Sequence, residues 1–108
     1  MIWEKVRELE ERLEHIKKEI NEIEKELASL PSGHIDSKKV NDNQYYYLRY
    51  WEDGKLKSRY IGKDASAIKA ELERSAELRQ KLARLKEEES KLQRALDKVN
   101  MAVISILF

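Results

Sequence analysis

Residues 2–30 read "IWEKVRELEERLEHIKKEINEIEKELASL", and their apolar side chains recur in alternating steps of four and three residues. The members of this series are Ile2, Val6, Leu9, Leu13, Ile16, Ile20, Ile23, Leu27 and Leu30. A repeat of this kind, sustained over four heptads, is typical of a helix in a coiled coil. The helix is expected to end at Leu30, because Pro31 disfavours helical geometry at the residue before it.

A second helix is expected from Asp64, whose carboxylate suits an N-cap, to the end of the chain at residue 108. Its alternating series holds Leu78, Leu82, Leu85, Glu89, Leu92, Leu96, Val99, Val103 and Ile106. Nearer the start of the helix, the same series would hold Glu71 and Ser75, while Leu72 and Ala76 lie one step round. This offset predicts a drift of the packing face. Two apolar stripes predict an antiparallel pair of helices.

The 33 residues between the helices carry strand signals, and a structureless loop of that length is unusual. "YYYLRYWEDGKLKSRYIGK" (45–63) contains a hairpin turn at residues 52–54, and "HIDSKKV" (34–40) with "NDN" (41–43) predicts a third strand and its turn. The predicted fold is α+β, mainly α: an antiparallel coiled-coil helical hairpin with a small three-stranded antiparallel β-meander at its tip. It is expected to form a single domain over residues 1–108, with helices 2–30 and 64–108 and the meander at 33–63.

The hairpin turn admits two registers. A two-residue Asp53-Gly54 turn places Trp51 opposite Leu56, whereas a three-residue loop that includes Glu52 places Trp51 opposite Lys55, and the slip exchanges the faces. The second register is preferred, because it separates apolar from aromatic and basic side chains. One face then holds Tyr46, Leu48, Tyr50, Leu56, Ser58 and Tyr60. The other holds Tyr45, Tyr47, Arg49, Trp51, Lys55, Lys57, Arg59 and Ile61.

The composition excludes several classes of chemistry. With no Cys, disulfides, thiolate metal sites and thiol catalysis are excluded, and a reducing, cytoplasmic location is expected. The high Glu and Lys content suits a heat-adapted source. His15 and His34 lack the spacing of a metal site, and the chain has no phosphate-binding glycine loop and no nucleophile elbow. The protein is therefore expected to be no enzyme and to need no metal or cofactor.

The meander is the expected binding surface. Residues 34–63 hold seven basic and four acidic groups, a balance of +3 against −2 for the rest of the chain. Basic groups bind phosphates and interleaved aromatic rings stack on bases, so DNA or RNA is the first expected partner. A protein partner, a chaperone role or a purely structural role are the alternatives. The predicted site residues are Lys38, Lys39, Tyr45, Tyr47, Arg49, Trp51, Lys55, Lys57, Arg59 and Lys63.

The tyrosine-rich stretch and its "DGK" turn resemble a family of short, uncharacterised prokaryotic proteins. The same stretch is similar to segments near the start of some insertion-sequence transposases, and its basic strand resembles the arm-binding sheet of tyrosine integrases. These resemblances cover about 30 residues and imply a mobile-element or nucleic-acid setting. The order of helix, hairpin and helix is similar to a prefoldin subunit, which implies a chaperone architecture.

Residues 97–108, "DKVNMAVISILF", are expected to extend beyond the first helix. They are apolar on nearly all sides, too short to span a membrane and without a basic face for lying on one. A homo-oligomer, most simply a two-fold dimer, is therefore expected. Its predicted contact residues are Ile2, Trp3, Val99, Val103, Ile104, Ile106, Leu107 and Phe108.

Overall fold

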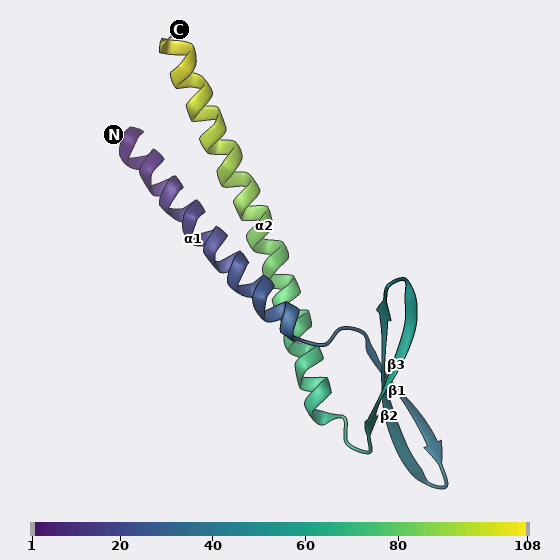
Figure 1. Cartoon of the computed structure of the whole chain (residues 1–108). Coiled ribbons are helices and arrows are strands. Elements are labelled where there is room, and N and C mark those ends of the chain that lie inside the picture. The colour runs from purple at the N-terminus through teal and green to yellow at the C-terminus, as the bar shows by residue number, and fades with distance from the viewer. Residues whose placement is uncertain (1, 108) are drawn as a thin grey trace. The chain divides into compact units, whose positions relative to one another are not determined.

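The computed structural model describes residues 2–107, without the side chains of Ile2 and Leu107. Its elements follow in the order α1 (Ile2–Ser29), β1 (His34–Val40), β2 (Asn43–Glu52), β3 (Lys55–Gly62) and α2 (Ser66–Leu107) (Figure 1). The helices hold 28 and 42 of the 108 residues, so the fold is α+β and mainly α, as predicted. No helix among residues 2–107 is long and apolar enough to span a membrane.

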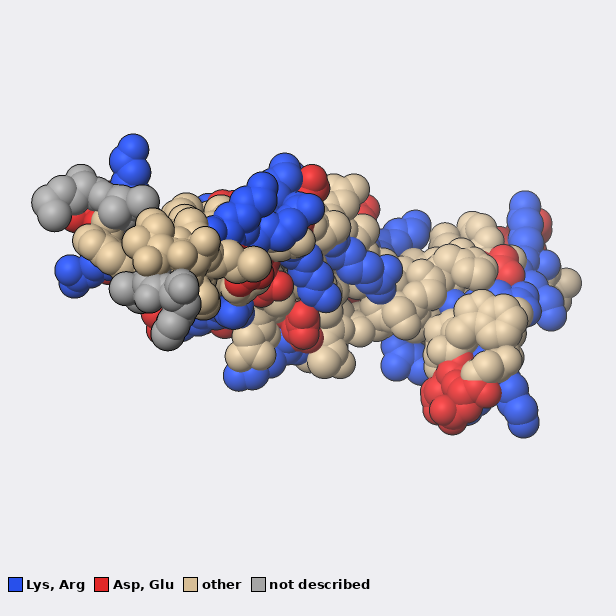
Figure 2. Space-filling view, turned by 90° about the horizontal axis from the view of Figure 1, so that it is seen from above, with Lys and Arg blue, Asp and Glu red and all other residues tan. Residues whose placement is uncertain are grey.

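The chain forms two compact units. The first unit joins the residues up to Lys25 with those from Gln80 onward, and the second unit is the continuous segment Glu26–Arg79. Each unit therefore contains part of both helices, and the second unit also contains the whole sheet. Figure 2 shows Lys and Arg side chains interspersed with Asp and Glu side chains over the surface in view.

In the first unit, α1 and α2 pack as an antiparallel pair. Val6, Leu13 and Leu96 form a buried cluster, and Leu9, Leu92 and Val99 pack against it. Arg12 donates from Nε and Nη2 to Glu88 Oε1 at 3.0 and 2.8 Å, and Lys81 Nζ lies 3.0 Å from Glu19 Oε1. These partners are seven residues apart on each helix and run in opposite directions. The predicted antiparallel pairing is confirmed.

The predicted drift of the packing face lies in the second unit, near the start of α2. Leu72 is half-buried, Ser75 is 2% exposed and Leu78 is 4% exposed, whereas Ala76 is exposed. The buried positions are thus successively three residues apart, where a regular repeat would alternate three and four. Ser75 therefore occupies a buried position of the helix that an apolar residue would usually hold.

Helix α2 begins where its capping residue predicts. The Ser66 N–H donates to Asp64 Oδ1 at 2.9 Å, and the first helical bond runs from the Lys69 N–H to the Ala65 carbonyl at 2.9 Å. Hydrogen bonds from Ser66 lower the pKa of the Asp64 carboxyl from its ordinary value of 3.8. The backbone N–H of Ser66 has the larger effect and its hydroxyl the smaller one. The carboxylate accepts an N–H that has no partner inside the helix.

The three strands form an antiparallel sheet in the order β1-β2-β3. Asn41 and Asp42, between β1 and β2, have φ values of 50° and 66°, and Asp53 and Gly54, between β2 and β3, have 52° and 75°. Positive φ at both central residues is the requirement of a type I′ turn, whose twist suits a two-residue hairpin. A bulge between Tyr46 and Tyr47 shifts the register near the end of β3.

Candidate functional site

The pairing of the strands divides the sheet into two faces, because successive side chains of a strand point to opposite sides. The outer face holds His34, Asp36, Lys38, Tyr45, Tyr47, Arg49, Trp51, Leu56, Ser58 and Tyr60. The inner face holds Ile35, Ser37, Lys39, Tyr46, Leu48, Tyr50, Glu52, Lys55, Lys57 and Arg59.

The inner face packs against the helical part of the second unit. Leu48 is only 3% exposed, and it lines a hollow together with Tyr50, Leu30 and Pro31. On the same face, Lys69 Nζ of α2 lies 5.5 Å from the centre of the Tyr46 ring, a cation–π contact. The outer face is therefore the side of the sheet that remains available to a partner.

The preferred hairpin register is wrong, and the alternative two-residue turn is the one that forms. Trp51 pairs with Leu56, and Glu52 pairs with Lys55. Consequently Lys55, Lys57 and Arg59 lie on the inner face instead of beside Trp51. The physical reason is the Asp-Gly turn, whose two positive φ values match the twist of the flanking strands without a bulge at that end.

Tyrosine rings gather at the centre of the outer face. The Tyr60 ring centre lies 5.3 Å from that of Tyr47 and 6.4 Å from that of Tyr45, both pairs being tilted. Tyr60 was predicted on the opposite face, and the Asp53-Gly54 turn was the feature of the sequence that could have placed it correctly. Trp51 lies further along the same face and is 71% exposed.

Charged groups surround these rings. Lys63 Nζ lies 5.7 Å from the centre of the Tyr45 ring, and Lys38 pairs with Tyr45 across the β1–β2 ladder. Arg49 Nη1 donates to Asp36 Oδ2 at 3.2 Å. This bond, and a second from the Ser37 N–H to Asp36 Oδ1, lower the pKa of the Asp36 carboxyl.

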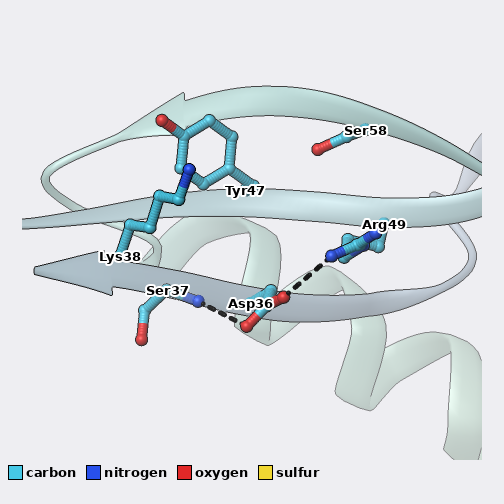
Figure 3. A pocket seen from close by; sticks show the side chains of 6 residues that line it. All are labelled: Asp36, Ser37, Lys38, Tyr47, Arg49 and Ser58. Atoms are coloured by element: carbon cyan, nitrogen blue, oxygen red, sulfur yellow. Dashed lines mark hydrogen bonds and ion pairs between the residues drawn. The ribbon is translucent and has the colours of Figure 1, made fainter.

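A shallow hollow of about 180 Å³ opens on the outer face beside the Arg49–Asp36 ion pair (Figure 3). It is smaller than the ~300–1,000 Å³ typical of sites for drug-sized ligands. Its lining residues are Asp36, Ser37, Lys38, Tyr47, Arg49 and Ser58. Asp36, Ser37 and Ser58 were not among the predicted site residues, because only the pairing of β1 and β3 with β2 brings them there.

The remaining cations of the predicted site are spread around the meander. Lys39, Lys55 and Arg59 are exposed on the inner face and have no ion-pair partner within residues 2–107. Lys57 Nζ pairs with Glu52 Oε1 at 3.2 Å. In the described part of the chain no group of three or more His, Asp or Glu side chains could hold a metal ion.

The residues predicted for self-association differ in how deeply they are buried in the single chain. Val99 contributes to the core of the helix pair, and Val103 is half-buried. Trp3, Ile104 and Ile106 are exposed, as is Met101, which was not in the predicted set. The side chains of Ile2 and Leu107, and the whole of Phe108, lie outside the described residues.

The fold and the site together define a coiled-coil protein that carries an open β-meander with an aromatic and basic outer face. Residues 6–74 match the profile of a family described as a domain of unknown function, DUF6788, and the chain belongs to this family. The matched segment includes the whole meander together with most of α1 and the first part of α2. No curated protein and no solved structure matches the chain.

Proposed function

We propose that the protein is a non-enzymatic nucleic-acid-binding protein whose contact surface is the outer face of the meander. The observation that supports this most directly is the cluster of Tyr45, Tyr47 and Tyr60, which Lys38 and Lys63 flank and which no element among residues 2–107 covers. Aromatic rings stack on bases of any sequence, and neighbouring cations bind the phosphates between those bases. The coiled coil serves as the support of this surface.

The corrected register changes the role of the other cations. Lys39, Lys55, Lys57 and Arg59 are exposed but lie on the opposite face from the tyrosines. They add to the positive field around the meander, which raises the rate of encounter with a polyanion. The direct phosphate contacts belong to Lys38 and Lys63, because Arg49 is engaged in an ion pair with Asp36.

A titration of fluorescently labelled DNA and RNA of mixed sequence at low salt, followed by anisotropy, tests the proposal. We expect binding that weakens steeply with added salt, because bound cations release counterions from the phosphates. Replacing Lys38 and Lys63 by Ala should weaken binding and reduce the logarithmic salt slope by about 1.4, since each phosphate contact on a single strand contributes ~0.7.

The matched control replaces Lys5 and Lys25 of α1 by Ala. Both are exposed and have no ion-pair partner in the described residues, so the net charge changes equally without touching the meander. Equal losses in the two double variants would show that only net charge matters and would overturn the surface assignment. Absence of binding at tens of micromolar protein would overturn the proposal.

A protein partner is the second candidate, and one observation favours it. Trp51 and Leu56 pair directly across the β2–β3 ladder and are 71% and 45% exposed. Exposed tryptophan is the residue type most enriched among the energetic centres of protein interfaces. Binding through this pair would depend weakly on salt and would be lost in Trp51→Ala, whereas the tyrosine cluster would be dispensable.

A further inference from the structure

The outer face distributes its rings and its charges in a way that distinguishes single strands from duplexes. Tyr45 and Tyr47 lie on β2, and their ring centres are 6.4 and 5.3 Å from the ring centre of Tyr60 on β3. The flanking lysines lie at the margin of this cluster. Tyr45 and Tyr47 are two residues apart on one strand, about 6.6 Å at ~3.3 Å per residue. Rings can reach the flat faces of bases only when those bases are unstacked, as they are in single strands.

Asp36 places a negative charge on the outer face, and phosphate binding alone does not account for it. Its carboxylate lies on the outer face in the strand next to Tyr47, where it would repel a phosphate. Because its pKa is lowered, it is ionised at neutral pH and can only accept hydrogen bonds. Its oxygens already accept from Arg49 Nη1 and from the Ser37 N–H, and each oxygen retains a further lone pair. A donor group of a ligand is the natural complement.

The Arg49–Asp36 pair presents donors and acceptors side by side at the edge of the hollow (Figure 3). Guanine carries the complementary sequence along its Watson–Crick edge: the O6 acceptor, then the N1–H donor, then the N2 amino donor. Adenine and cytosine each offer an amino donor followed by a ring-nitrogen acceptor, and uracil and thymine place one donor between two acceptors. Only guanine gives a carboxylate two adjacent donors while giving an arginine an acceptor.

Resting on the proposed function, we infer that the hollow formed by Asp36, Arg49, Tyr47 and Ser58 binds an unstacked guanine of a single-stranded nucleic acid. Arg49 donates to O6, and the Asp36 carboxylate accepts from N1–H and the N2 amino group. The Tyr47 ring provides a stacking wall, and Lys38 binds an adjacent phosphate. The small volume of about 180 Å³ fits a single base rather than a whole nucleotide cofactor.

The test compares short thymidine oligonucleotides that differ in one central base: dG, dI or dA. We expect the dG strand to bind about tenfold more tightly than the dA strand, a ratio within the range of one good bidentate base contact. The dI strand, which keeps O6 and N1–H but lacks the N2 amino group, should fall between them. Annealing the dG strand to its complement should weaken binding. A uridine strand with one central guanosine should show the same preference, and its affinity relative to the DNA strand identifies the preferred sugar.

Asp36→Asn should remove the preference for guanine, because an amide replaces one of the two acceptors by a donor. The control Glu52→Gln breaks the Lys57 ion pair on the inner face and should leave the preference unchanged. Circular dichroism should report equal helix content in both variants. Equal binding of dG, dI and dA strands overturns this inference and leaves the proposed function standing. A guanine preference that survives Asp36→Asn also overturns it, and absence of binding to any strand overturns both proposals.

Discussion

At the scale of single residues, Gly33 is the position where the fold depends most on a missing side chain. Its φ of 113° is a conformation that other residues rarely adopt, and a Cβ placed there would collide with the Arg49 carbonyl oxygen. The same Cβ would lie 3.1 Å from the Tyr50 Cβ. The chain leaving α1 therefore passes directly against the middle strand, which requires glycine.

We predict that Gly33→Ala destabilises the protein more than Gly62→Ala does. Gly62 has a similar φ of 121°, but no atom in the described part of the chain lies within 4 Å of its added Cβ. The Gly62 variant should therefore lose only the conformational term, about 1–3 kcal/mol, while the Gly33 variant must also displace backbone. Denaturant midpoints of the two variants measure the difference, and equal losses would show that β2 moves away without cost.

The Asp64 carboxylate predicts a local dependence on pH. Its pKa in the folded chain is below the ordinary value of 3.8, mainly because it accepts the Ser66 N–H. Because the pKa is lower in the folded chain, the contribution of this cap to the stability of α2 is complete at pH values above the ordinary pKa of 3.8. It is lost as the pH falls through the lower pKa of the folded chain. We expect the first turn of α2 to loosen in that acidic range.

Amide exchange of Ser66, followed by NMR against pH, measures this loosening. Asp64→Asn keeps an acceptor oxygen but removes the titrating group, so its Ser66 amide should no longer respond over the same range. An unchanged response in the variant would mean that another group titrates there.

At the scale of elements, Ser75 is a polar residue at a core position of α2, only 2% exposed. We predict that Ser75→Ala stabilises the protein by up to about 1 kcal/mol, because Ala favours the helix and removes a hydroxyl from the core. Ser90→Ala, at an exposed position of the same helix, is the matched control for helix preference alone. Thermal unfolding of both variants gives the comparison, and a lower midpoint for Ser75→Ala would mean that the hydroxyl stabilises this helix pair.

The helices were predictable from sequence and the faces of the sheet were not, for a physical reason. In α1 the apolar side chains from Val6 to Ile23 all lie on one stripe that is buried. Many residues therefore predict the same helix and the same packing face. In the hairpin a one-residue slip reverses every face, and the choice depends on a single turn. Segregation of apolar from basic residues was the wrong criterion, because Leu48 and Arg59 pair on one face: Leu48 is buried while Arg59 reaches solvent.

The same reasoning explains which parts of the candidate site were found. Tyr45, Tyr47, Arg49 and Trp51 all alternate along β2, so they share a face in either register. Tyr60 and Ser58 come from β3 and join that face only in the register that forms. Asp36 depends in addition on the pairing of β1, which the short "NDN" turn predicted without fixing side-chain partners.

At the scale of the whole molecule, several large apolar side chains near the ends of α1 and α2 are exposed to water in the single chain. Met101, Ile104 and Ile106 on α2 are 72%, 56% and 86% exposed, and Trp3 on α1 is 61% exposed. They lie in the first unit, in which Val99 packs against the buried cluster of the helix pair. Large exposed apolar side chains in one part of a molecule are typical of an interaction site.

We predict that the protein self-associates through these residues, most simply as a two-fold dimer. Light scattering of the whole chain should give a mass of twice 12.8 kDa. Replacing Met101, Ile104 and Ile106 by Glu should return the mass to that of one chain, as should deletion of residues 101–108. Trp51→Ser with Leu56→Ser removes the exposed apolar pair of the meander and should leave the dimer intact. A chain that stays monomeric at high concentration, or a dimer lost only in the meander variant, would contradict the prediction.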